Sequence, residues 1–220
     1  MELVKAGLKL DFTEAMSPWL DLRGLFRAAQ DDPGAEVQGQ PLVTVNTDRR
    51  QRVVLQVKSF SVEQEGTAAH PASPDAALSV VERIAAATPL EEVRSRRFDM
   101  MFIDPFELPF QELVSEMKSS IFVQGGLIDR ATDIAVSLDE RIGESDTNHM
   151  QIGPMSPPQL NAQFLAISRD DLPEQFLFIG IGRSWTTPVS FSLDSLIGDF
   201  HAFAEWAPAR AADLAGIVRR

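Results

Sequence analysis

The chain has no cysteine and no tyrosine among its 220 residues. The absence of cysteine excludes disulfide bonds, thiolate nucleophiles and every zinc or iron–sulfur site that depends on sulfur ligands. The absence of tyrosine removes the phenolic group, so the aromatic residues are 14 Phe and three Trp. Acid–base chemistry is therefore restricted to carboxylates, hydroxyls, amines, guanidinium groups and three histidines.

Long hydrophobic runs are also missing. No stretch of about 18 apolar residues occurs, so the sequence predicts no membrane-spanning helix. The first nine residues, MELVKAGLK, contain neither the apolar core nor the cleavage site of a signal peptide. Together with the absence of cysteine, these features predict a cytoplasmic protein that does not bind a membrane.

Positive charge is scarce. The chain has 20 Lys and Arg against 32 Asp and Glu, with a formal net charge of −12 and a pI near 4.7. A nucleic-acid-binding protein needs a basic face for the phosphates, so we do not expect nucleic acid as a partner. Sixteen of the 20 basic residues are Arg, a bias typical of GC-rich bacterial genes.

Hydrophobic periodicity predicts an α+β fold, with four to five helices packed on a mainly antiparallel sheet. The predicted strands cover residues 2–12, 42–46, 52–58 with a continuation to 65, 96–103, 133–142, 149–152, 159–168 and 175–181. The predicted helices cover residues 17–29, 73–88, 110–121 and 192–207, and Pro208 is expected to kink or restart the last one.

The chain length fits one domain over residues 1–220. The alternative is two intimately packed halves of β-α-β-β-α type, 1–90 and 91–220, because the order strand, helix, strands, helix occurs twice. No residue motif is repeated between these halves, so only the order of elements supports the alternative.

Two of the histidines could take part in a metal site. On the predicted last helix, His201 and Glu205 are four residues apart, and Asp194 precedes His201 by two turns, so the three share one helix face. His149 lies three residues after Asp146 in the chain. Either group would suit a metal-dependent hydrolase, which is the enzymatic alternative that the sequence leaves open.

Glycine motifs predict no bound cofactor. Gly180-Ile181-Gly182 follows an apolar run but lacks the third glycine and the helix of a dinucleotide loop. Gly125-Gly126 is not followed by Lys-Ser/Thr, and no Gly-x-Ser-x-Gly elbow occurs. We therefore expect neither a cofactor nor a catalytic serine of the elbow type.

Acidic residues are concentrated in one segment. Residues 99–146 contain eleven acidic and three basic side chains. Within this segment, two prolines flank an extended apolar stretch at 104–110. The predicted partner-binding residues are Asp104, Phe106, Glu107, Leu108, Phe110, Glu112 and Glu116.

We expect a non-enzymatic protein-binding module, or accessory subunit of a cytoplasmic assembly, that docks another protein with a basic surface. The acidic side chains would accelerate association, and the apolar ones would supply the buried contacts. A special case is an acidic inhibitor or immunity-type protein that blocks a basic nuclease. The metal-dependent hydrolase remains the alternative from a different class.

Overall fold

The computed structural model describes residues 1–14, 36–38, 42–46, 50–67, 70–87, 90–122, 130–155, 159, 163–164 and 172–219, and at 36–38 and 42–46 only the backbone. The described strands are β1 (Glu2–Phe12), β2 (Glu36–Gln38), β3 (Leu42–Asn46), β4 (Gln51–Gln56), β5 (Ser59–Glu65), β6 (Glu92–Pro105), β7 (Val136–Arg141), β8 (Asp146–Pro154), β9 (Phe176–Trp185) and β10 (Val189–Ser190). They form one antiparallel sheet, in the order β2-β3-β4-β5-β1-β6-β9-β8-β7, with β10 paired to β6.

The described helices are α2 (Pro74–Ala87), α3 (Phe110–Ile121) and α5 (Leu193–Val218). The predicted α+β class with a mainly antiparallel sheet is thus confirmed. The expected number of four to five helices is corrected to three in the described part of the chain. The predicted helix 17–29 lies outside that part, and Pro208 lies inside the continuous α5.

The continuity of α5 through Pro208 has a packing explanation. A proline inside a helix removes one backbone hydrogen bond and crowds the preceding turn. Phe203 and Ala207 before the proline, and Ala211 and Leu214 after it, are all buried on the same side. The continuous apolar face therefore holds both parts of the helix against the sheet.

Three predicted boundaries are corrected. Val57 and Lys58 form a turn, so the predicted strand that continues to residue 65 is two antiparallel strands, β4 and β5. β8 begins at Asp146, inside a segment predicted as a loop. Gln159 and Gln163 are helical rather than extended, and most of the predicted strand 159–168 lies outside the described residues.

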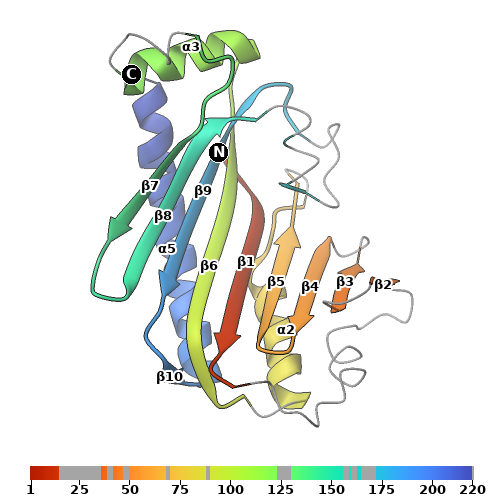
Figure 1. The fold of residues 1–220 in the computed structure, drawn as a ribbon. Helices are drawn as coiled ribbons and strands as arrows, with labels where there is room; N and C mark the ends of the chain where they lie inside the picture. Colours follow the sequence, from red (N-terminus) through yellow and green to blue (C-terminus); the bar gives the residue numbers. More distant parts are fainter. Residues whose placement is uncertain are drawn as a thin grey trace.

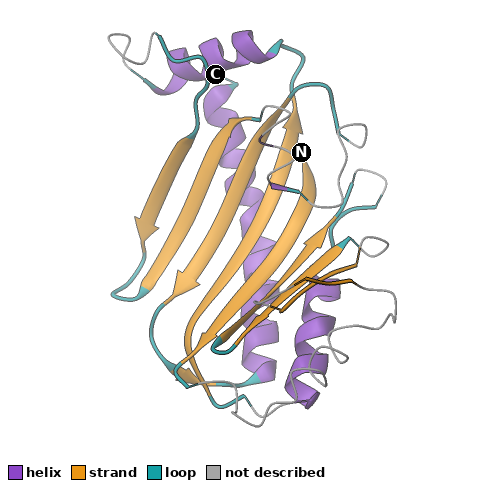
Figure 2. Cartoon of the chain, turned by 45° about the vertical axis from the view of Figure 1, so that its right-hand side comes forward, coloured by secondary structure: helices purple, strands orange, loops and turns teal. Residues whose placement is uncertain are grey.

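Two helices cover one face of the sheet. α5 packs against β6 and β9, α2 packs against β1 and β5, and the two helices also touch each other. α3 lies across the end of the sheet and contacts α5 and β8 (Figure 1). Figure 2 shows the same layers from a second direction. In the described part of the chain, no helix is long and apolar enough to cross a membrane.

The main core lies between the sheet and these helices. Its largest fully buried side chains include Phe60, Phe98, Phe200, Leu10 and Ile84. A second, smaller cluster consists of Val4, Ile103, Phe164, Leu172 and Phe176. Since side chains alternate along a strand, Ile103 and Phe176 belong to the face that α2 and α5 leave uncovered. We call this the open face.

Candidate functional site

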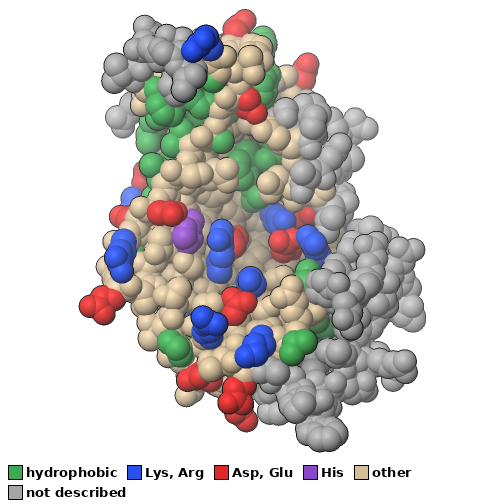
Figure 3. Space-filling model, viewed as in Figure 1, with side chains coloured by type: hydrophobic (Ala, Val, Ile, Leu, Met, Phe, Trp, Pro, Cys, Tyr) green, Lys and Arg blue, Asp and Glu red, His purple; other side chains and the backbone are tan. Residues whose placement is uncertain are grey.

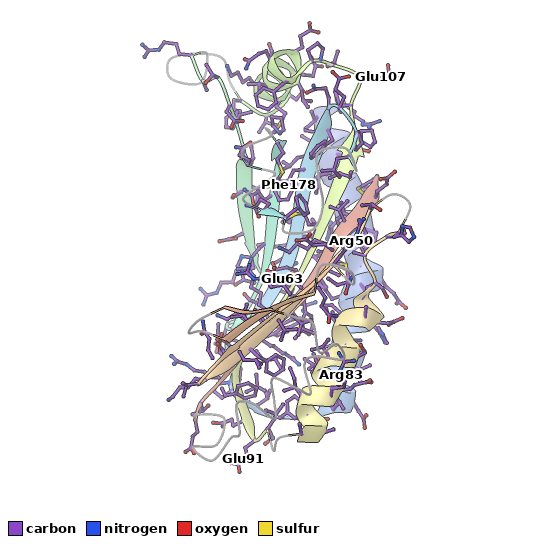
Figure 4. The ribbon with its side chains drawn as sticks, turned by 90° about the vertical axis from the view of Figure 1, so that its right-hand side faces the viewer. Arg50, Glu63, Arg83, Glu91, Glu107 and Phe178 are labelled. Atoms are coloured by element: carbon purple, nitrogen blue, oxygen red, sulfur yellow. The ribbon has the colours of Figure 1, made fainter. Side chains whose placement is uncertain are left out.

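The open face has a pocket of about 580 Å³ over the middle strands of the sheet. Charged side chains gather in the middle of this face, and hydrophobic side chains gather toward the α3 end (Figure 3). The polar lining includes Lys5, Glu63, Arg97, Asp99, Asp139 and His149. Met101 and Phe178 contribute apolar lining. In Figure 4, Glu63 and Phe178 lie on the side of the sheet away from α2 and α5.

One row of residues crosses this pocket from β5 to β7. Each member is the register partner of the next, so the row is continuous across six strands. In order, it consists of Glu63, Gly7, Asp99, Gly182, His149 and Asp139. Charged or polar side chains therefore alternate with glycines over the middle strands.

The glycines determine where the charged groups lie. Asp99 has a glycine on each side, Gly7 on β1 and Gly182 on β9. A Cβ atom added at Gly182 would lie 2.7 Å from Asp99 Oδ1, so this carboxylate occupies the space that a larger residue would fill. Glycine inside a strand weakens the sheet and often marks a close approach of another group. The row therefore makes a shallow floor at the centre of the sheet.

The pocket is balanced in charge although the chain as a whole is acidic. Lys5 Nζ lies 3.0 Å from Glu63 Oε2. Arg97 donates two hydrogen bonds from Nε and one from Nη2 to the Asp99 carboxylate, at 2.8–3.0 Å. Hydrogen bonding to Asp99 raises the pKa of Arg97, against the opposing effect of burial. Arg97 is therefore a permanent cation in this pocket.

His149 connects three strands through both of its ring nitrogens. Nδ1 lies 2.8 Å from Asp139 Oδ1 on β7, and Nε2 lies 2.8 Å from Ser184 Oγ on β9. The His149 side chain is 28 % exposed, whereas that of Asp139 is 71 % exposed. This Ser–His–Asp arrangement was not predicted, because its members come from separate strands and no local motif marks them.

The predicted pairing of His149 with Asp146 is wrong. The two residues are three apart on β8, and residues separated by an odd number along a strand point to opposite faces. Asp146 instead lies 3.8 Å from Arg183 Nη2. If the strand had been predicted to begin at Asp146, the alternation of its side chains would have shown from the sequence that His149 and Asp146 cannot pair.

The other predicted metal site is also corrected. His201 Nε2 lies 3.0 Å from Asp75 Oδ1 on α2, a partner that the helix spacing did not predict. Among the residues with described side chains, no group of three or more His, Asp or Glu could hold a metal ion. Exposed positions one turn apart share a helix face, but their side chains need not converge, and here a neighbouring helix supplies the partner.

The predicted docking segment lies at the α3 end of the sheet, where Figure 4 labels Glu107. Its apolar members, Phe106, Leu108 and Phe110, are half-buried, and the two phenylalanines pack against the main core. Asp104 is buried and paired with Arg219, at 2.7 Å between Oδ2 and Nη2. The exposed members are the acidic side chains Glu107, Glu112 and Glu116.

No protein-family model and no curated protein matches this sequence. The geometry of the open face is therefore the main indication of function.

Proposed function

We propose that this protein is a binding protein for a small organic molecule, which it holds in the open-face pocket. The observation that carries the proposal is the position of Asp99, a paired carboxylate between Gly7 and Gly182 on the neighbouring strands. Small-molecule sites are concave and combine apolar lining with a few fixed polar groups. The volume of about 580 Å³ suits a ligand of this kind.

The charge pairs favour a neutral or zwitterionic ligand. Lys5, Arg97 and His149 each have a carboxylate partner within the pocket. A strongly anionic ligand would have to compete with these carboxylates for the same cations, and a strongly cationic one would have to displace the cations. Hydroxyl, amide or ester groups can instead add hydrogen bonds without breaking a pair.

The apolar lining indicates that the ligand has two chemically different ends. Phe178 and Gly182 are both on β9 and on the same face, four residues apart, which is about 13 Å along a strand. A molecule that spans this distance would place an apolar group near Phe178 and Met101 and a polar group near Asp99 and His149. We therefore propose an amphipathic ligand.

The proposal can be tested with a substitution that fills the pocket. Gly180 lies on the pocket floor, and an added Cβ would lie 3.3 Å from Phe178 Cζ and 3.7 Å from Gln151 Cβ, so the Phe178 side chain would have to shift slightly to admit a larger residue. A library of neutral, zwitterionic and anionic compounds would be screened by thermal shift against the unmodified protein and Gly180→Leu. The matched control is Gly198→Leu, at an exposed helical position with open space around it.

We expect neutral or zwitterionic amphipathic compounds to stabilise the unmodified protein and Gly198→Leu but not Gly180→Leu. Compounds that stabilise all three proteins equally would bind elsewhere and would contradict the proposal. A library in which only multiply charged anions bind would contradict the assignment of the ligand class.

Docking of a basic protein partner is a second candidate. It is favoured by the exposure of Glu107, Glu112 and Glu116 at the α3 end, with Glu112 and Glu116 one helical turn apart. Exposed acidic side chains accelerate association with a basic surface. The double variant Glu112→Lys/Glu116→Lys should then abolish recovery of the partner from host extracts, whereas the control Glu82→Lys on α2 should not. Equal recovery of the partner with the double variant and with the control would contradict this candidate.

A further inference from the structure

The hydrogen-bond chain from Asp139 through His149 to Ser184 has a geometry that the binding function does not require. We propose that Ser184, His149 and Asp139 act as nucleophile, general base and orienting acid, and transfer the acyl group of an ester to water. The inference rests on the proposed function only for the way in which the pocket holds the substrate. The chemical step depends on the three side chains themselves.

We call the chain Ser184–His149–Asp139 the relay, and its distances meet the requirements of proton transfer from serine to histidine. A nucleophile and its base must lie within about 2.6–3.2 Å of each other, and a third group must orient the base. Both contacts of His149 are 2.8 Å. When Nδ1 donates its hydrogen to Asp139, Nε2 carries the lone pair and can accept the proton of Ser184 Oγ.

The three residues are held by the sheet rather than by loops. Asp139 and His149 are register partners between β7 and β8, and His149 is the partner of Gly182, two residues before Ser184 on β9. Since side chains two residues apart share a face, all three point to the open face. Gly182 adds no side chain between His149 and Asp99, so the Asp99 carboxylate can lie over this part of β9.

A cationic residue lies opposite Ser184 on the neighbouring strand. β9 has a strand on each side, so its backbone N–H groups are used within the sheet and cannot stabilise an oxyanion. Arg97 is the register partner of Ser184 on β6, and directly opposed side chains on one face are about 5 Å apart at Cβ. We therefore assign the Arg97 guanidinium as the group that stabilises negative charge on the carbonyl oxygen.

The reaction has two balanced steps. Ser184 Oγ attacks the carbonyl carbon and gives its proton to His149 Nε2, and the tetrahedral adduct collapses as the C–O bond of the ester breaks. The leaving alcohol takes the proton from Nε2, which leaves an acyl-Ser184 ester. Water then gives a proton to Nε2, its oxygen attacks the acyl carbon, and Ser184 leaves with that proton, releasing a carboxylic acid.

The substrate class follows from the surroundings of the relay. Gly182, two residues before Ser184 on β9, lies at the edge of the pocket nearest the relay, and Met101 and Phe178 lie further along the pocket. An ester with an apolar acyl chain and an alcohol leaving group fits this order. The ester group itself carries no charge, so it can enter the pocket without breaking the charge pairs there.

The chain contains its own control. His201 also pairs with a carboxylate, at 3.0 Å from Asp75 Oδ1, but no hydroxyl side chain is bonded to its other nitrogen among the described residues. A general reactivity of histidine–carboxylate pairs would appear at both histidines. A specific relay would depend on His149 alone.

The test uses the full chain and two probes, a fluorophosphonate that forms a covalent bond to activated serine and p-nitrophenyl butyrate as a chromogenic ester. The labelled residue would be identified by peptide mass spectrometry, and ester hydrolysis would be followed by release of nitrophenolate. The variants are Ser184→Ala, His149→Ala and Asp139→Asn, with Ser190→Ala and His201→Ala as controls. Each variant would be compared only after thermal unfolding shows that it is folded.

The expected result is labelling of Ser184 in the unmodified protein and in both controls, with no labelling of Ser184→Ala. Hydrolysis should fall about 100-fold or more in His149→Ala and about tenfold or more in Asp139→Asn, and it should be unchanged in the controls. Since Asp139 is exposed on an edge strand, Asp139→Asn keeps the inference testable if another variant unfolds.

Absence of labelling at Ser184 in the folded protein would overturn the inference. Labelling that persists in His149→Ala, or activity lost equally in His201→Ala, would also overturn it, because His149 would then not be the specific base. The two proposals fail separately. If compounds bind the pocket but Ser184 is not labelled, only the proposed catalytic role of the relay is contradicted. If Ser184 is labelled but no compound binds the pocket, only the proposed binding function is contradicted.

Discussion

Asp104 and Arg219 join the end of β6 to the end of α5, with 2.7 Å between Oδ2 and Nη2. Arg219 also donates a hydrogen bond to the carbonyl of Pro105, at 3.1 Å, and its guanidinium lies 5.3 Å from the centre of the Phe106 ring. Three consecutive residues of the predicted docking segment are thus contacts of α5. This contact explains why the segment is only partly available at the surface.

Replacement of Asp104 with Asn should destabilise the protein. The Asp104 side chain is only 9 % exposed, so loss of its charge leaves the donors around it without an ionised acceptor. We expect the free energy of unfolding to fall by about 1–3 kcal/mol, measured by urea denaturation. The matched control is Asp213→Asn, whose pair with Arg210 is exposed on α5, with an expected change within about 0.5 kcal/mol. An equal loss in both variants would contradict a special role for the β6–α5 contact.

Phe98 should be a critical residue for packing of α5 on the sheet. Its side chain is fully buried, and its ring centre lies 4.9 Å from those of both Trp185 and Phe200. Phe98→Ala removes these contacts and leaves a cavity, so we expect a loss of about 3–5 kcal/mol in unfolding free energy. Val57→Ala, at a turn position 66 % exposed, should change stability by less than about 0.5 kcal/mol. A loss below about 1 kcal/mol for Phe98→Ala would contradict this packing.

Two glycine-to-alanine substitutions should have opposite effects. A Cβ at Gly66 would lie 2.0 Å from the backbone nitrogen of Ala72 and 2.4 Å from the backbone carbon of Pro71, so the chain would have to move. We expect Gly66→Ala to lose about 3 kcal/mol of stability. At Gly198, inside α5, nothing lies within 4 Å, and alanine should add about 0.5–1 kcal/mol through helix propensity. Thermal unfolding of the two variants checks both signs, and a stabilised Gly66→Ala would contradict the close approach.

The fold class could be predicted from the sequence because long elements have clear periodic patterns. The helix 110–121 and the strand 2–12 match α3 and β1. The pairing of the strands could not be predicted in the same way. β1 and β6 are neighbours at the centre of the sheet although about 90 residues separate them in the chain. The division into halves at residue 90 stays a prediction. Two similarities between the halves are present among the described strands. β5 pairs with β1 and is the last long strand before α2, and β9 pairs with β6 and is the last long strand before α5.

The candidate site could not be predicted, since its members meet only through the register of the sheet. In the sequence, Gly182 is part of an incomplete dinucleotide motif, and nothing there identifies it as the neighbour of Asp99. His149 is a candidate from the sequence alone, but its partners Asp139 and Ser184 come from β7 and β9. Single-sequence patterns specify which face a side chain occupies, whereas the residue opposite it depends on pairing between distant segments.

Pro208 offers a test of whether α5 is shaped by its proline or only tolerates it. Alanine at this position would restore a backbone N–H that can donate to the carbonyl of Ala204, and it would remove the clash of the proline ring with the preceding turn. Because Pro208 is exposed, no core contact is lost. An interior proline costs a helix about 3 kcal/mol relative to alanine, but it also restricts the unfolded chain by about 0.4–1 kcal/mol, so we expect a net gain of about 2 kcal/mol. Urea denaturation of Pro208→Ala, with Glu205→Ala as an exposed control on the same helix, measures this gain. A loss of stability would instead show that the proline sets the path by which Ala211, Leu214 and Val218 reach the core.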